Sequence, residues 1–294
     1  MDGPEIIALA DGRALAVDDV GDRRGVPVVY LHGTPDSRLG RPPDEGAAQA
    51  GVRLLALDRP GAGHSDPHPA ARLSSLGHDV RAVLDRWGID QVILLGWSSG
   101  GLSALAAATV LGDRVRAVGL IAPIPPVEAY AEADIVSGLG PARRRFAEMA
   151  LEVPAAELAA EVAPYLVPQP LTPALALEHV LDGAGETGRG ELAAVAGSAE
   201  RLAGSLAASV RQGLVGLQHD VALQLEPGLD LSGIRVPVRT FHGSEDGVSP
   251  SIVGAWLVGR LPNAVLDLSP GGSHHLLFPR WAGILRALRR DAAM

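Results

Sequence analysis

The chain has 294 residues, which allows one large domain or a domain that carries a substantial insertion. Its composition, 47% hydrophobic and 20% charged, is typical of a globular protein. The formal net charge is −9 and all 25 basic residues are arginine, so the chain is poorly suited to bind nucleic acid. The absence of cysteine excludes disulfides, thiolate nucleophiles and zinc sites built on cysteine.

The sequence shows no targeting or membrane signal. The first 17 residues include Glu5 and Asp11 and have no apolar run of signal-peptide length. No segment approaches the roughly 20 apolar residues that a bilayer crossing needs. We therefore expect a cytoplasmic protein with no membrane span.

The first part of the chain alternates strand-like and helix-like patterns. A hairpin is predicted around Asp11-Gly12, between residues 5–9 and 13–20. Short apolar runs then recur, each typical of a strand buried on both faces, and helical spacing separates them. These runs cover 26–32, 52–58, 91–95 and 115–121. The pattern predicts a mostly parallel sheet covered by helices.

From about residue 125 to 231 the sequence shows no convincing strand pattern, and its Ala-, Leu- and Glu-rich composition predicts helices. The clearest periodicity predicts one helix over 191–217. Strands are predicted again at 236–241 and 264–268, followed by a helix over 276–288. We thus expect an α/β core formed by residues 1–123 and 233–294, with a helical domain at 124–232.

The segment Gly-Trp-Ser-Ser-Gly at 96–100 lies between a predicted strand and a predicted helix. A G-x-S-x-G motif in this context forces its serine into a sharp turn, with Oγ exposed beyond the strand end. Glycines are needed on both sides because a Cβ would clash with the neighbouring strand or helix. Ser98 is therefore the candidate nucleophile, and Trp97 beside it is a candidate to line a pocket.

A serine nucleophile needs a base that is held by an acid, and both follow later in the chain. Asp246 comes after the strand at 236–241, with Glu245 as the competing acid. His274 and His275 come after the last strand, and either could be the base. Backbone N–H groups of Ser99 and Thr34 could stabilise an oxyanion. We expect His32 to hold its loop through hydrogen bonds.

Five motifs together resemble the α/β-hydrolase fold superfamily. They are His-Gly-Thr-Pro at 32–35, Asp-Arg-Pro-Gly-Ala-Gly-His-Ser-Asp at 58–66, Gly-Trp-Ser-Ser-Gly-Gly at 96–101, His-Gly-Ser-Glu-Asp at 242–246 and Gly-Gly-Ser-His at 271–274. The resemblance implies a mostly parallel eight-stranded sheet flanked by helices. It also implies that Ser98 is the nucleophile, Asp246 the acid and His274 the base. His275 is then the less favoured base and a candidate pocket residue.

The same resemblance implies that the helical segment at 124–232 is a cap domain. Asp220 matches a position in related proteins with such caps, and we expect it to anchor the cap rather than to act in catalysis. The run Arg143-Arg144-Arg145 is most simply a solvated helix face, the alternative being an anchor for an acidic substrate. His64 and His68 have no carboxylate at a spacing that would complete a metal site. No organic cofactor is implied.

The resemblance suggests an esterase-like serine hydrolase, with a lactone, thioester or amide as other possible bonds. Because Ala, Leu and Val dominate the expected cap, we expect a small to medium apolar substrate. The fold does not fix the reaction. One alternative is a cofactor-independent lyase, oxygenase or cyclase that uses the same base and oxyanion hole. Two others are an aminopeptidase similar to proline iminopeptidase and a binding protein without activity.

Overall fold

The computed structural model describes residues 3–294 and contains one eight-stranded sheet. The strand order is β1-β2-β4-β3-β5-β6-β7-β8. The first two strands pair antiparallel, β2 also pairs antiparallel with β4, and all other pairs are parallel. The strands are β1 (Glu5–Ala8), β2 (Ala14–Gly21), β3 (Val26–Leu31), β4 (Val52–Leu57), β5 (Val92–Trp97), β6 (Val115–Ile121), β7 (Val238–Gly243) and β8 (Ala264–Ser269). The predicted fold class is confirmed.

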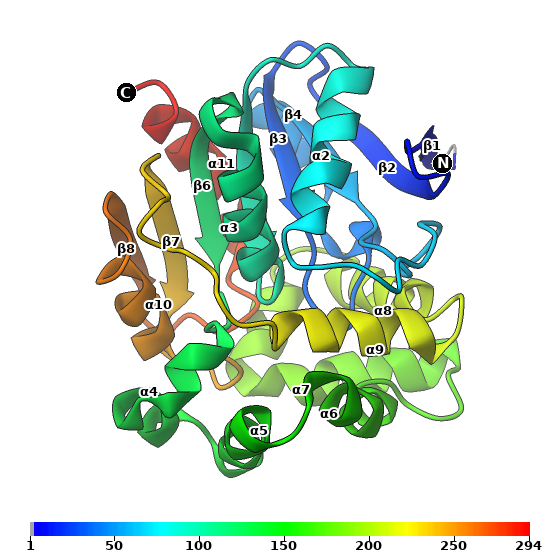
Figure 1. Ribbon diagram of the computed structural model, residues 1–294, viewed down its shortest axis with the longest axis vertical. Helices are drawn as coiled ribbons and strands as arrows, with labels where there is room; N and C mark the ends of the chain where they lie inside the picture. The colour runs from blue at the N-terminus through cyan, green and yellow to red at the C-terminus, as the bar shows by residue number, and fades with distance from the viewer. Residues whose placement is uncertain (1–2) are drawn as a thin grey trace.

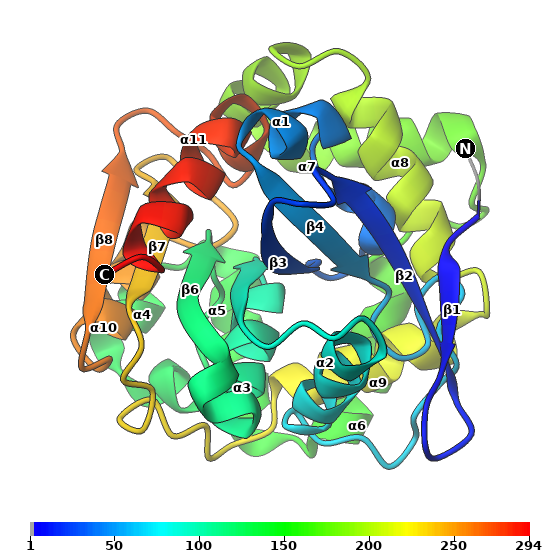
Figure 2. The ribbon, with the colours of Figure 1, turned by 90° about the horizontal axis from the view of Figure 1, so that it is seen from above.

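Helices cover both faces of the sheet (Figure 2). Helices α2 (Ser75–Arg86) and α3 (Gly100–Leu111) pack on one face, whereas α1 (Asp44–Gln49) and α11 (Leu277–Asp291) pack on the other. Helix α10 (Ser251–Val258) covers β7 and β8. The central strands are therefore buried on both sides, which explains why their sequences are almost continuously apolar.

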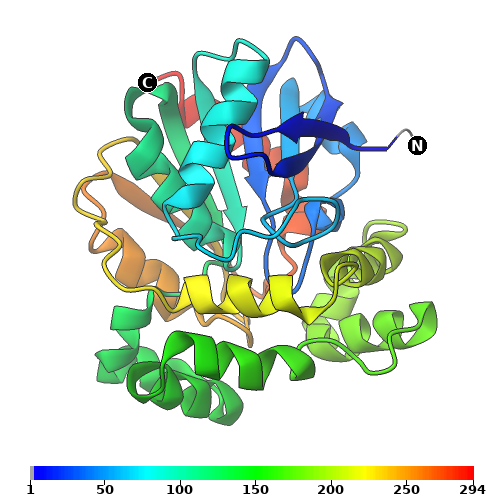
Figure 3. The same ribbon diagram turned by 45° about the vertical axis from the view of Figure 1, so that its right-hand side comes forward.

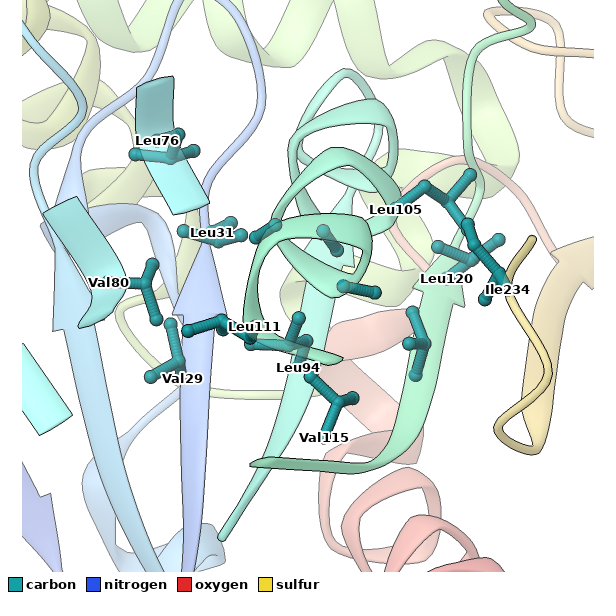
Figure 4. Packing of buried hydrophobic residues seen from close by; sticks show 14 of the residues in the cluster. Val29, Leu31, Leu76, Val80, Leu94, Leu105, Leu111, Val115, Leu120 and Ile234 are labelled. Atoms are coloured by element: carbon teal, nitrogen blue, oxygen red, sulfur yellow. The ribbon is translucent and has the colours of Figure 1, made fainter. Parts of the chain in front are cut away.

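The core on the α2–α3 side follows directly from the periodicity of these helices. Leu76 and Val80 of α2 point toward the sheet, where Val29 and Leu31 of β3 meet them (Figure 4). Their four-residue spacing places both side chains on one helix face. On the opposite side of the sheet, Trp281 of α11 is buried against strand residues in the same way.

Residues 122–237, all of them described, contain helices and loops and no strand. The α-helices are α4 (Ala133–Gly138), α5 (Pro141–Glu152), α6 (Ala155–Val162), α7 (Pro173–Ala193), α8 (Ser198–Ser209) and α9 (Leu214–Gln224). Figures 1 and 3 show that they lie across the end of the sheet to which the parallel strands point. We call residues 127–224 the helical layer.

The single helix predicted over 191–217 is wrong. The segment contains the end of α7, all of α8 and the start of α9. Gly197, before α8, and Gly213, before α9, have φ values of 74° and 89°, which no right-handed helix contains. Within each of these helices the apolar residues keep helical spacing. Periodicity alone therefore could not reveal the breaks at Gly197 and Gly213.

Within residues 3–294, no helix combines the length and the apolar character that a membrane crossing requires.

Candidate functional site

Ser98 lies in the turn between β5 and α3, at the carboxyl end of the sheet. Its φ is 54°, a left-handed conformation that is strained for a residue other than glycine. The Ser98 N–H donates to the carbonyl of Ile121 at 2.8 Å, which ties the turn to β6. A Cβ at Gly96 would collide with the carbonyl oxygen of Gly100, and one at Gly100 with that of Leu31. The two flanking glycines therefore allow the turn.

Asp246 and His274 come from the loops after β7 and β8, and they form a direct contact. Asp246 Oδ2 lies 2.8 Å from His274 Nδ1. The other oxygen, Oδ1, accepts hydrogen bonds of 2.8 Å from the N–H groups of Val248 and Ser249. Because these contacts fix both oxygens, the carboxylate is held in a single orientation beneath the imidazole.

The environment of Asp246 favours its ionised form. Burial alone would raise the pKa of its carboxyl group, but the charge of a protonated His274 opposes that effect. Hydrogen bonds from His242, from His274 and from the Ser249 N–H add to this opposition, and the pKa is held well below its usual range. Asp246 is therefore an anion that can orient an imidazole and stabilise its protonated form.

The two adjacent histidines have different surroundings. Trp97 Nε1 donates to the His274 carbonyl at 3.0 Å, so Trp97 helps to place the segment that carries both rings. The His275 ring contacts no carboxylate, and its buried Nδ1 has no partner among residues 3–294. Burial, together with the charge of a protonated His274, lowers the pKa of His275 to about 3. Only His274 is paired with an acid.

Glu245, the competing acid, points elsewhere. Its side chain is exposed, and Oε2 accepts a 3.0 Å hydrogen bond from Thr187 of α7. The carboxyl group that meets the histidine is thus that of Asp246, one residue later in the same loop.

The loop after β3 also packs closely against the turn that contains Ser98. A Cβ at Gly33 would lie 3.2 Å from the Ser98 Cβ, so this approach depends on glycine. Among the described residues, neither the Thr34 N–H nor the Ser99 N–H donates a hydrogen bond to another group. Two free backbone donors are thus available beside Ser98.

Arg59, in the loop after β4, fixes the position of the loop after β3 through hydrogen bonds. Its Nη2 donates to the carbonyl of Gly33 at 2.6 Å and to Thr34 Oγ1 at 2.8 Å. Its Nη1 lies 2.8 Å from Asp220 Oδ1, and Asp220 also accepts a hydrogen bond from the Thr34 hydroxyl. Asp220 belongs to α9, so the ion pair connects the helical layer to the loop after β4, and the hydrogen bond from Thr34 connects it to the loop after β3.

His32 fixes the same loop, as the sequence predicted. Its Nδ1 donates to the Gly33 carbonyl at 2.8 Å, and its Nε2 accepts the Arg59 N–H at 3.0 Å. Burial, with the nearby guanidinium of Arg59, holds the pKa of His32 well below its usual range. His32 is therefore neutral, as its accepting Nε2 requires.

A cavity of about 530 Å³ lies between the sheet and the helical layer. Ser98, Ser99 and Thr34 line it from the sheet side, with His274, His275 and Trp97. Most of the remaining lining is apolar and comes from the helical layer, including Tyr130, Phe146, Val162, Leu166, Leu202 and Leu206. A ligand in this cavity would be surrounded by hydrocarbon and would still reach the serine.

Two charged residues line the cavity wall, and the sequence analysis missed the first of them, Asp36. Asp36 is 6% exposed, and its Oδ1 accepts a 2.8 Å hydrogen bond from the Ser37 N–H and another from the Ser205 hydroxyl. Its Oδ2 has no partner among residues 3–294, and burial raises the pKa of the carboxyl to about 7. The loop position after Pro35 carried no signal that its side chain would turn inward.

Arg143 is the second charged residue of the wall, and the simplest expectation, a solvated face for the whole arginine run, is wrong for Arg143. Arg144 and Arg145 are exposed, but Arg143 is half-buried and lines the cavity. The separation follows from helix geometry, because successive residues of α5 point about 100° apart.

Within residues 3–294, no group of three His, Cys, Asp or Glu side chains is arranged to hold a metal ion.

A family model described as alpha/beta hydrolase fold matches residues 26–279. Epoxide hydrolase B of Mycobacterium tuberculosis is 35% identical over 105 residues, which cover 34% of this chain and 30% of that protein. A non-heme chloroperoxidase of Streptomyces lividans is 31% identical over 129 residues, 41% of this chain and 45% of that protein. The chain thus matches less than half the length of these curated relatives.

Solved structures are similar over the whole chain. An esterase from Exiguobacterium antarcticum superposes with a TM-score of 0.70 and 18% identity, covering 99% of this chain and 100% of the esterase. At this level of identity the similarity establishes the fold.

Proposed function

Since the chain belongs to the α/β-hydrolase fold family, we propose that it is a serine hydrolase that cleaves an ester-type bond. The observation that carries this proposal is the 2.8 Å contact between Asp246 and His274, beside the cavity that Ser98 also lines. The strained turn at Ser98 and the two free N–H groups of Thr34 and Ser99 support it. The name of the similar esterase from Exiguobacterium antarcticum favours an ester over other acyl bonds.

In the first half of the proposed reaction, His274 Nε2 takes the proton of Ser98 as Oγ attacks the substrate carbonyl. Asp246 keeps the Nδ1 proton of His274 in place and stabilises the imidazolium. The N–H groups of Thr34 and Ser99 donate to the oxyanion that forms, a contribution worth about 10²–10³ in rate for each donor. The C–O bond then breaks, and the alcohol leaves with the proton from His274.

In the second half, water attacks the acyl group on Ser98. His274 takes one proton from the water, and Ser98 Oγ leaves with that proton when the acid is released. The net reaction consumes one water and yields one carboxylic acid and one alcohol. The apolar lining of the cavity favours a small to medium apolar acyl or alcohol group.

Under this proposal the helical layer acts as the cap over the site, and Asp220 anchors it. Asp220 contacts Arg59 and Thr34 and does not itself line the cavity. Asp220 would therefore affect the reaction only by positioning the loop that contains Thr34.

The test uses steady-state kinetics with p-nitrophenyl butyrate. We expect Ser98→Ala and His274→Gln each to lower kcat/KM by about 10³-fold or more. The matched variant His275→Gln should lower it by no more than about 10-fold, because His275 has no acid partner and would act only through packing. If Ser98→Ala retains turnover within a few-fold of the wild type, or if His275→Gln is the more damaging of the two histidine variants, the assignment is wrong.

A further inference from the structure

Arg143 lies in the first turn of α5 and faces the cavity that contains Ser98. Its neighbours Ala142 and Phe146 also line that cavity, so this end of α5 forms part of the wall. The Phe146 ring packs edge-on against Tyr130, with centroids 6.2 Å apart. The guanidinium is thus placed beside an aromatic pair that holds α5 against the preceding segment.

The guanidinium of Arg143 forms no ion pair and no hydrogen bond within residues 3–294. The three buried arginines among the described residues, Arg38, Arg41 and Arg59, are all paired with aspartate at 2.6–2.9 Å. A guanidinium has five donors, and leaving it partly desolvated without an acceptor is unfavourable. Arg143 therefore has unused capacity to bind an anion.

Among the described residues, no carboxylate in or next to the cavity pairs with Arg143. Asp246, which attracts Arg143 through space, has both oxygens engaged by His274 and by two backbone N–H groups. Asp36, the carboxyl that lines the cavity, forms no hydrogen bond or ion pair with Arg143 within residues 3–294 and interacts electrostatically with Arg59. Burial lowers the pKa of Arg143, but an arginine remains protonated at neutral pH. The cavity thus presents a fixed positive charge.

We propose that Arg143 binds a carboxylate of the substrate, so that the preferred substrates are esters that bear a carboxylate separated from the ester carbonyl by an apolar chain. The inference rests on the proposed function for the bond that is cleaved, and it adds the substrate class. The planar guanidinium can hold a carboxylate through two parallel hydrogen bonds. Apolar side chains such as Phe146 and Leu166 line the same cavity and would pack against the connecting carbons.

Two matched pairs of esters test the proposal and locate the carboxylate. Monoethyl adipate and ethyl hexanoate differ in a carboxylate on the acyl side, whereas 6-acetoxyhexanoate and hexyl acetate differ in one on the alcohol side. We expect the wild type to prefer the anionic ester of at least one pair by about 10-fold or more in kcat/KM.

Arg143→Gln should lower kcat/KM for that anionic ester by about 10- to 100-fold, mainly through KM, and should change the neutral ester by less than about threefold. Arg145→Gln is the matched control, because its side chain is exposed on the same helix and, within residues 3–294, pairs only with Glu148 at 3.4 Å. This control should leave kcat/KM unchanged for both esters. Preference for the neutral ester in both pairs, or an equal loss on both esters in Arg143→Gln, would overturn the inference.

A binding measurement separates this inference from the proposed function. Ser98→Ala protein is titrated with hexanoate and with hexanamide, and its thermal unfolding is followed. Hexanoate should raise the Tm of Ser98→Ala and leave that of Ser98→Ala/Arg143→Gln unchanged, and hexanamide should affect the two proteins equally. If no ester is cleaved but the rise in Tm caused by hexanoate still depends on Arg143, the proposed reaction fails and the carboxylate site stands. Equal stabilisation of both proteins by hexanoate contradicts the site.

Discussion

Asp36 is a carboxyl group in a setting that opposes its ionisation. Burial is the main cause, and hydrogen bonds from Ser205 and from the Ser37 N–H only partly offset it, so that the pKa is about 7. The unfolded chain ionises this group near pH 3.9. Between these two values the folded state holds a proton that the unfolded state has released. Stability should therefore fall as the pH rises from about 4 to about 7.

Asp36→Asn tests this directly, because asparagine keeps an oxygen that can accept both hydrogen bonds and cannot ionise. Subtracting the free energy of unfolding of the variant from that of the wild type cancels the titration of all other groups. We expect this difference to fall by up to about 4 kcal/mol between pH 4 and pH 8, as urea unfolding at each pH would show. A difference that stays constant with pH, or that rises, would show that Asp36 is ionised in the folded state.

At the scale of elements, the contact between α9 and the loop after β4 positions one side of the site. Gly216 of α9 meets Gly61 of that loop with no room for a side chain, since a Cβ at Gly61 would lie 2.6 Å from the Gly216 Cα. Asp220 lies one turn further along α9 and pairs with Arg59 of the same loop. The two contacts therefore share a helix face, and both depend on the close approach.

Gly216→Val should push α9 away from the loop and weaken the Arg59–Asp220 pair. We expect the free energy of unfolding to fall by about 1–3 kcal/mol, together with a loss of kcat, because Thr34 loses its support. Gly204→Ala in α8 is the control: its added Cβ meets nothing within 4 Å, and it should stabilise the protein by up to about 1 kcal/mol. Chemical unfolding measures the stability of both variants, and ester kinetics measure their kcat. Unchanged stability and activity in Gly216→Val would refute the proposed anchoring.

The elements themselves were predictable to different degrees. Continuous apolar runs such as 26–32 and 52–58 predicted the strands, because burial on both faces leaves no room for polar alternation. The breaks before α8 and α9 were not predicted, although Gly197 and Gly213 mark them. A glycine is tolerated inside a helix as well as at its end, and only the positive φ in the folded chain distinguishes the two.

At the scale of the whole molecule, the candidate site combines segments that are far apart in sequence. Residues 32–36, 98–99, 246–248 and 274–275 follow different strands, and parallel strands bring their carboxyl ends to one edge. This rule allowed the strand-end residues to be predicted together. It gave no information on Arg143, because the side of α5 that faces the cavity depends on how the helical layer packs on the sheet.

The account as a whole depends on the hydroxyl of Ser98 being an activated nucleophile. The most direct measurement is the intact mass of the protein after incubation with a fluorophosphonate, followed by peptide mapping. We predict a single adduct on the peptide that contains Ser98, at one equivalent per chain and with activity lost in proportion, and no adduct in Ser98→Ala. A wild-type protein that hydrolyses esters and remains unlabelled, or that is labelled at another residue, would contradict the account.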